Sequence, residues 1–204
     1  MKLPAPIQKA VDQLSELPSI GPRQAIRLAF YLIGQGEQHI HDLAAGIAAL
    51  GKIKTCERCF FIHKNAGALC DICANPRRAQ GTIMVVEKET DLISLENTGK
   101  FAGRYFVIGE IPKAGMLENW QKLRLQSLKK FIESPAPNGL GGKADEIILA
   151  FNPTSMGDLQ ASLVTKELGP LSKKMSRLGR GLPTGGEIEF ADDETLSAAM
   201  ERRS

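Results

Sequence analysis

The segment CERCFFIHKNAGALCDIC, residues 56–73, contains all four cysteines of this 204-residue chain, as two pairs whose members are separated by two residues. Two thiolates at this spacing can bind one ion through adjacent turns, and a second pair completes a tetrahedron of ligands. Four thiolates leave no open coordination position, so the segment predicts a structural zinc site. The expected ligands are Cys56, Cys59, Cys70 and Cys73.

A redox dithiol is the alternative for a Cys-x-x-Cys pair. Two matched pairs in one short loop, ahead of the first expected strand, favour the metal site instead. His63 lies between the pairs and is expected to be a solvated loop residue, because the four thiolates already suffice. Basic residues around the pairs are expected to offset the surplus negative charge: Lys54, Arg58, Lys64, Arg77 and Arg78.

The residues before the cysteines, 1–54, are expected to be entirely helical. Apolar side chains recur at helical spacing over residues 7–17, and Pro18 ends this helix. A second helix begins at Pro22, a residue suited to a first helical turn, and runs to about residue 33. A third is expected over residues 40–50.

The turn Leu17–Pro22 between the first two helices fits a helix-hairpin-helix. In that motif, backbone N–H groups of the turn and the N-terminus of the second helix meet a DNA phosphate. Gly21 can take a positive φ and lets the backbone approach closely. Arg23 and Arg27 are four residues apart and therefore share one helix face near its start. An ordinary αα-hairpin packed on a core is the alternative.

The residues after the cysteines alternate between short apolar segments and helical ones, which predicts a doubly wound parallel sheet. The expected strands are residues 82–87, 104–108 and 146–151, with helices around 92–95, 120–131 and 159–168 and a Pro/Gly-rich loop at 134–142. Functional residues of such sheets gather at the carboxyl ends of the strands. The tail beyond residue 170 is rich in glycine, but no Gly-Lys-Ser/Thr follows to make it a phosphate-binding loop.

Polar residues follow two of these strands: Glu87 after the first, and Asn152, Thr154 and Asp158 after the third. Glu87 is placed to act as a general acid or base. Phosphoryl chemistry with Mg²⁺ also needs further carboxylates, for which a hydroxyl and an amide are poor substitutes. A structural role for Glu87 is therefore favoured.

The composition is that of a globular protein, with 43% hydrophobic and 24% charged residues, which excludes a disordered or collagen-like chain. A net charge of +3 permits a nucleic-acid partner without demanding one. Aromatic residues make up only 5%, which disfavours stacking platforms for single strands. No run approaches 18 apolar residues and the N-terminus lacks a signal-peptide pattern, so we expect a cytoplasmic protein without membrane contact.

The combination of these motifs resembles the RecR family of bacterial recombination mediators over nearly the whole chain. Leu17–Pro22 resembles the family's hairpin turn, and the four cysteines with Asn75–Arg78 resemble its zinc finger. Further segments follow in the family's order: Val85–Glu87, Thr98–Gly99, Gly103–Val107, Asn152–Thr154 and Gly181–Glu189.

The resemblance implies a multi-domain α+β protein. Its expected parts are a helix-hairpin-helix domain (1–54), a four-cysteine zinc finger (55–76), an α/β Toprim domain with a parallel sheet (77–170) and a Gly-rich C-terminal segment (171–204). In this fold Glu87, Asn152, Thr154 and Asp158 would be the remains of a Toprim site.

The resemblance also implies ring-shaped homo-oligomers that encircle DNA, close to the nucleoid. It implies work with RecO, and often RecF, in loading recombinase onto gapped DNA during repair. The expected protein is not an enzyme. An Mg²⁺-dependent Toprim nuclease or primase-like enzyme using Glu87 is one alternative, and a pure protein–protein scaffold without salt-dependent DNA affinity is another.

The chain departs from the family pattern in three places. Met156 stands where a Glu is usual, and Arg180 where a His is usual. The segment Glu110–Gly142 replaces a loop rich in Pro, Asp and Gly. These departures are expected to affect partner contacts more than DNA encirclement, and Met156 removes another acid from the Toprim site.

Overall fold

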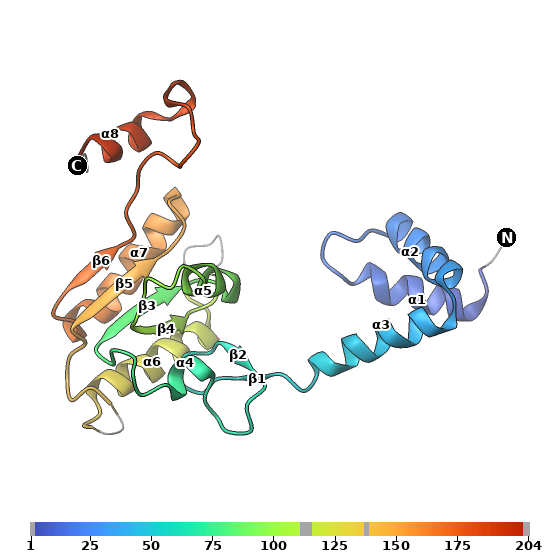
Figure 1. Cartoon of the computed structure of the whole chain (residues 1–204), viewed down its shortest axis with the longest axis horizontal. Helices are drawn as coiled ribbons and strands as arrows, with labels where there is room; N and C mark the ends of the chain where they lie inside the picture. The colour runs from blue at the N-terminus through green and yellow to red at the C-terminus, as the bar shows by residue number, and fades with distance from the viewer. Residues whose placement is uncertain (1–2, 111–115, 137–138, 202–204) are drawn as a thin grey trace. The chain divides into compact units, whose positions relative to one another are not determined.

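The computed structural model describes residues 3–110, 116–136 and 139–201. Contacts divide the chain into two compact units, with the boundary between Ile53 and Lys54 (Figure 1). Parts of the divergent segment Glu110–Gly142 and of the expected loop at 134–142 lie outside the described residues.

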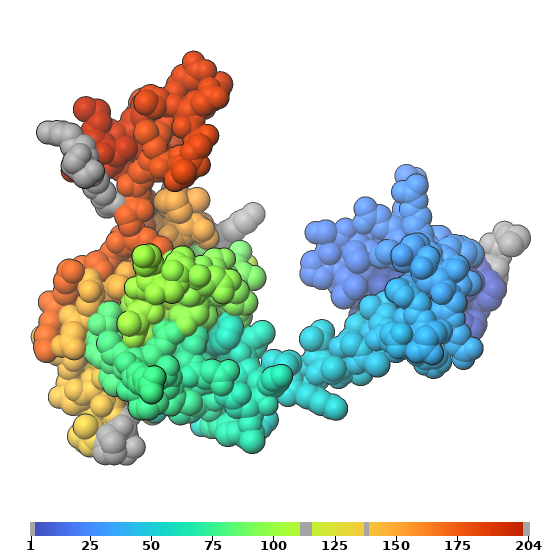
Figure 2. All heavy atoms as spheres, in the orientation of Figure 1, coloured from blue at the N-terminus to red at the C-terminus, as the bar shows by residue number. Residues whose placement is uncertain are grey.

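The N-terminal unit consists of three helices: α1 (Ala5–Ser15), α2 (Pro22–Gln35) and α3 (Glu37–Leu50). The first helix therefore begins and ends two residues earlier than predicted. Its partner α2 packs against it in an antiparallel hairpin, and the atoms of the unit form one continuous body (Figure 2). The core between them consists of Val11, Ala25 and Ala29, flanked by Ile7, Leu14, Ile20 and Ile26.

The cysteine segment opens the second unit. Two short strands, β1 (Lys54–Thr55) and β2 (Ile62–His63), pair antiparallel. A single helical turn, α4 (Asp71–Ala74), follows them and carries the last cysteine. The segment therefore consists of a small hairpin and a helical turn.

The sheet of the second unit is entirely parallel, as predicted, in the order β4-β3-β5-β6. Its strands are β3 (Thr82–Val86), β4 (Arg104–Val107), β5 (Glu146–Ala150) and β6 (Met175–Arg177). The first, second and third predicted strands are present, whereas β6 was not predicted. Three residues are too few for a periodic pattern, and β6 lies in the stretch assigned from sequence to the C-terminal segment.

Helices cover both faces of this sheet (Figure 1). The longer helices α6 (Asn119–Glu133) and α7 (Ser155–Leu168) pack on one face, against side chains such as Val85 and Phe106. On the other face α5 (Glu89–Glu96) contributes Leu92 to a second core. Because successive strand residues point to opposite faces, each strand supplies both cores.

The 3-10 turn η1 (Gly169–Leu171) follows α7, and the C-terminal segment beyond it contains the 3-10 turn η2 (Ile188–Phe190) and the helix α8 (Asp193–Glu201). Leu171 and Met175 pack against the core of the sheet, whereas Ile188 is 68% exposed and Phe190 79%. Within the described part of the chain, no helix has the length and apolar character needed to cross a membrane.

Candidate metal centre and nucleic-acid interface

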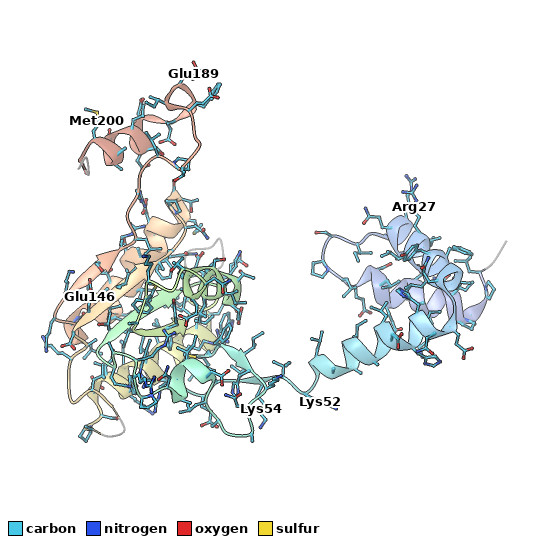
Figure 3. All side chains as sticks on the ribbon, viewed as in Figure 1. Arg27, Lys52, Lys54, Glu146, Glu189 and Met200 are labelled. Atoms are coloured by element: carbon cyan, nitrogen blue, oxygen red, sulfur yellow. The ribbon has the colours of Figure 1, made fainter. Side chains whose placement is uncertain are left out.

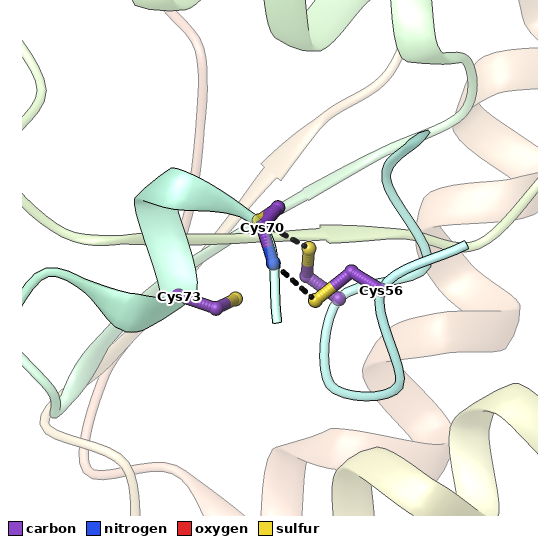
Figure 4. A group of neighbouring side chains, drawn as sticks. Cys56, Cys70 and Cys73 are labelled. Atoms are coloured by element: carbon purple, nitrogen blue, oxygen red, sulfur yellow. Dashed lines mark hydrogen bonds between the residues drawn. The ribbon is translucent and has the colours of Figure 1, made fainter. Parts of the chain in front are cut away.

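The four cysteines converge on one buried point. Cys56, Cys59, Cys70 and Cys73 are at most 3% exposed, and their sulfur atoms all lie within 4.8 Å of one another. Figure 4 shows the Cys56 and Cys73 side chains directed toward each other from the loop and from α4. The Sγ atoms of Cys59 and Cys70 are 3.5 Å apart. Tetrahedral zinc with bonds of about 2.3 Å requires sulfur separations of about 3.8 Å, so the donor set fits such an ion.

The backbone turns around each pair hold this geometry. The Phe60 N–H donates to the Cys56 carbonyl at 2.9 Å, and the Ala74 N–H donates to the Cys70 carbonyl at 2.9 Å. Phe60 adopts φ of +63° in its turn. Its ring meets Phe106 of the sheet edge-on, with centroids 5.6 Å apart, so the first cysteine pair is packed onto the sheet.

The protonation of these thiols shows why the site suits a cation. Contacts with Cys59, then with Cys70 and Cys73, lower the pKa of Cys56, whereas contact with Cys56 raises the pKa of Cys59 well above its usual range. Cys56 is thus favoured as a thiolate, and the pKa of Cys70 is also lowered, to about 7, whereas Cys59 and Cys73 keep their protons. Full ionisation of four adjacent buried thiols requires a metal ion.

His63 differs from its sequence-based description, because it is buried on β2. Its Nδ1 accepts the N–H of Asn65 at 3.2 Å, and it is not part of the four-sulfur group. It is therefore a buried residue of the hairpin, and the expectation of a solvated loop histidine was wrong.

Several of the basic residues expected to offset the thiolate charge have other partners. Arg78 pairs with Glu96 and donates to the carbonyl of Gly103 at 2.9 Å, and Lys54 donates to the Ala66 carbonyl at 2.9 Å. The guanidinium of Arg58 stacks on the ring of Phe131 at 5.1 Å.

One arginine that the sequence pattern did not indicate does reach the site. Arg104 on β4 is buried, and its Nη1 donates to the carbonyl of Cys73 at 3.1 Å. Burial lowers the pKa of Arg104 and the nearby Arg58 lowers it further, whereas Cys73 and Cys59 act in the opposite sense. The contact joins residues 31 positions apart, so no local sequence signal could have indicated it.

The N-terminus of α2 carries the candidate phosphate-binding residues. Gly21 is the N-cap, no side chain caps this end, and its first turn contains no acidic residue. Arg23 and Arg27 are both exposed and line one shallow depression. Figure 3 shows Arg27 projecting outward from α2. The positive end of the helix dipole and both guanidinium groups therefore face solvent together.

The backbone of the turn differs from the expectation for Gly21. Its φ is −85°, an extended conformation open to any residue, and the positive φ occurs at Ser19 instead, at +65°. A Cβ added at Gly21 would meet no atom within 4 Å. The positive φ predicted at Gly21 is therefore wrong, whereas its missing side chain leaves open space in front of the helix, as a close approach of the backbone requires.

Glu87 lies at the carboxyl end of β3, next to residues that follow β5. Asn152 donates through Nδ2 to Glu87 Oε2 at 2.8 Å, and Thr154 and Met156 line the same pocket. Burial raises the pKa of Glu87, and the amides of Asn152 and Gln160 partly oppose this effect. Thr154 itself caps α7 by accepting the Gly157 N–H at 3.1 Å.

Asp158 does not line the Glu87 pocket. It pairs with Arg177 at 2.6 Å and with Arg180, and these contacts, led by that of Arg177, lower its pKa. Arg180 also pairs with Glu194 of α8. The Glu87 pocket therefore contains one buried acid, and the only group of three or more metal-ligating side chains in the described residues is the cysteine set.

A helical hairpin, a four-cysteine metal site and a parallel Toprim-like sheet together define a class of proteins that act in DNA recombination and repair. Family models agree part by part: "RecR, helix-hairpin-helix" matches residues 7–50, "Toprim domain" matches 81–179, and "RecR, C-terminal" matches 181–204.

Curated relatives match the chain from end to end. "Recombination protein RecR" of Roseiflexus castenholzii is 38% identical over 204 residues, covering 98% of this chain and 94% of the relative. Its namesake from Dehalococcoides mccartyi is 40% identical over 200 residues, covering 97% and 93%. One from a Synechococcus strain is 40% identical over 196 residues, covering 95% and 97%. The chain belongs to the RecR family.

Proposed function

We propose that this protein is a non-catalytic, zinc-containing DNA clamp that mediates recombinational repair. The observation that carries the proposal is the uncapped N-terminus of α2, where Gly21, Arg23 and Arg27 face solvent without an acidic neighbour in the first turn. Such a helix end attracts a phosphate group through its N–H groups and its dipole. Contacts of this kind position a protein on DNA without reading its sequence.

We assign the metal as Zn²⁺. Four buried thiolates are the ligand set of structural zinc, because zinc accepts tetrahedral sulfur coordination and leaves no position open for substrate. Here the metal stabilises the fold and takes no part in a reaction.

We further propose a homo-oligomer, in which several modest phosphate contacts add up through effective concentration. Helix α3 supports this assembly, because none of its residues is buried although it carries large apolar side chains. Helix α2 contacts α3, yet four of these side chains remain 39–67% exposed: Ile40, Leu43, Ile47 and Leu50. Apolar surface of this kind marks a contact with another molecule, which we assign to a second copy in a ring around DNA.

The partners in this proposal are RecO and RecF, and the action is the loading of recombinase onto gapped DNA near the nucleoid in the cytoplasm. The experiment that tests the proposal as a whole is native mass measurement of the full chain with and without duplex DNA. We expect an oligomer that binds DNA of unrelated sequences equally and releases it as salt rises. A monomer, or a DNA affinity that does not depend on salt, would contradict the DNA clamp and favour the protein–protein scaffold.

The Glu87 pocket favours a structural role over phosphoryl chemistry, because its single buried acid is hydrogen-bonded to Asn152. We expect no cleavage of nicked or single-stranded DNA with Mg²⁺ or Mn²⁺, by either the wild-type chain or Glu87→Gln. If the wild type cleaves DNA and Glu87→Gln does not, the protein is a Toprim nuclease and the non-catalytic assignment is wrong.

The same substitution has a pH-dependent effect on stability. The pKa of Glu87 is raised by folding, so the stability that the group contributes at low pH is lost as pH rises through the folded-state pKa. The glutamine amide of the variant keeps an acceptor for Asn152 and does not ionise. In denaturant titrations Glu87→Gln should exceed the wild type in unfolding free energy at about pH 8, with the difference shrinking toward about pH 4. If the difference in unfolding free energy between the two proteins is the same at all pH values, the pKa of Glu87 is not raised by folding.

The C-terminal segment is expected to close the oligomer, since Ile188 and Phe190 are exposed in the single chain. A chain ending at Gly179 should lose oligomeric mass. The ion pairs of Arg180 with Asp158 and Glu194 are surface contacts, and such pairs contribute little to stability. Glu194→Gln in the full chain is the matched control and should keep the mass. Unchanged mass and stability in the truncated chain would refute this role.

A further inference from the structure

Strand β4 lies directly against the cysteine site and touches both of its halves. At its first residue, Arg104 Nη1 donates to the carbonyl of Cys73, at 3.1 Å. At its last residue, the Val107 N–H donates to the carbonyl of Cys59, at 2.8 Å. Each cysteine pair is thus tied by one hydrogen bond to one end of the same four-residue strand.

The charge of Arg104 has no carboxylate partner among the residues that the structure describes. The side chain is only 5% exposed, and its Nε has no hydrogen-bond partner there. A buried guanidinium without a counter-charge is strongly unfavourable. It lines a cavity of about 10 Å³ together with Arg58 and Cys73, large enough for about one water molecule but not for an acidic side chain.

The four-cysteine site supplies the missing negative charge. Four thiolates around one Zn²⁺ carry a net charge of −2, and the site is buried together with Arg104. Lys54 and Arg78 have partners elsewhere, the Ala66 carbonyl and Glu96. Arg58 lines the same cavity but stacks on the ring of Phe131. Arg104 is the buried cation bonded directly to a ligand residue.

We propose that Arg104 is the counter-charge of the metal site and the anchor that fixes its second cysteine pair to the sheet. This inference rests on the proposed zinc binding. The guanidinium lowers the energy of the anionic metal–thiolate group, and its bond to Cys73 holds α4 in register with β4. Metal binding and the position of the edge strand β4 therefore depend on each other.

The test compares full-length Arg104→Gln with Arg77→Gln, which removes an exposed arginine four residues after Cys73. Zinc content of the wild type is measured first. Zinc transfer to a chromogenic chelator should be about 10- to 100-fold faster in Arg104→Gln, the range for outer-shell partners of metal ligands, and unchanged in Arg77→Gln. In Co²⁺-loaded protein the thiolate-to-cobalt charge-transfer band should shift in Arg104→Gln alone, because the field on the sulfurs has changed.

The outcomes separate the two proposals. A wild type without zinc refutes the metal assignment. A zinc-containing wild type whose Arg104→Gln variant matches it in release rate and cobalt spectrum refutes the role of Arg104, even if its melting temperature falls. Should Arg104→Gln not fold, Arg104→Lys decides: it keeps the charge and should retain wild-type zinc content and cobalt band energy. A folded Arg104→Lys that loses zinc or shifts the band contradicts the counter-charge.

Discussion

Cys59→Ser should abolish metal binding and leave little folded protein. Cys59 is a buried member of the four-sulfur group, and its carbonyl accepts the Val107 N–H of the sheet, so we expect the loss to spread from the site into β4. The apparent binding energy of structural zinc in small domains is about 10–16 kcal/mol, whereas a whole domain is stable by about 5–15 kcal/mol. We therefore expect the metal to decide whether residues 55–75 fold.

Elemental analysis and circular dichroism of the soluble fraction measure this effect. His63→Gln is the matched control, because His63 is buried between the same cysteine pairs but lies outside the four-sulfur group. It should retain about one metal ion per chain, the number that four ligands of a single tetrahedral site hold. Zinc-free wild-type protein, purified without chelator and fully folded, would show that the cysteines serve another purpose.

The double substitution Arg23→Ala, Arg27→Ala should remove most DNA affinity and leave the fold intact. Both side chains are exposed and neither forms an ion pair with a described residue, so their removal does not disturb the core of α1 and α2. Each phosphate contact contributes about 0.9 to the slope of log affinity against log salt concentration on duplex DNA. The slope should fall by about one for each phosphate that the variant no longer binds, summed over the subunits that engage.

Lys9→Ala, Lys52→Ala is the matched control. It also removes two positive charges from the N-terminal unit, but away from the N-terminus of α2. Fluorescence anisotropy at several salt concentrations should show near wild-type slope for this control. Zinc content and oligomeric mass should be unchanged in both double variants. Equal reductions of affinity in the two variants would mean that net charge, rather than the α2 terminus, determines binding.

Local signals in the sequence were sufficient for most of the fold. The cysteine spacing predicted the metal cluster, and the β-branched runs at 82–87 and 146–151 predicted two central strands of the parallel sheet. These features depend on neighbours in the chain and on burial on both faces of a strand, which leave a visible pattern.

Features created by long-range contacts were not predictable in this way. Gly21 was expected to take a positive φ and to allow a close approach of the backbone, but the positive φ occurs at Ser19. Asp158 was grouped with Glu87 by strand position, but Arg177 of the unpredicted β6 holds it instead. The role of Arg104 was not visible in the sequence, because the residue whose carbonyl accepts its hydrogen bond, Cys73, lies 31 residues earlier.

The strand order β4-β3-β5-β6 determines when each strand can pair during protein synthesis. Strand β3 lies between β4 and β5, so one of its edges has no partner while the ribosome adds residues 108–145. At about 5–20 residues per second, this interval lasts roughly 2 to 8 seconds. The outer edge of β4 is protected during that time, because the Cys59 turn that covers it has already been made. We therefore expect that a metal ion bound during translation would hold this turn in place and keep the outer edge of β4 from pairing with another chain.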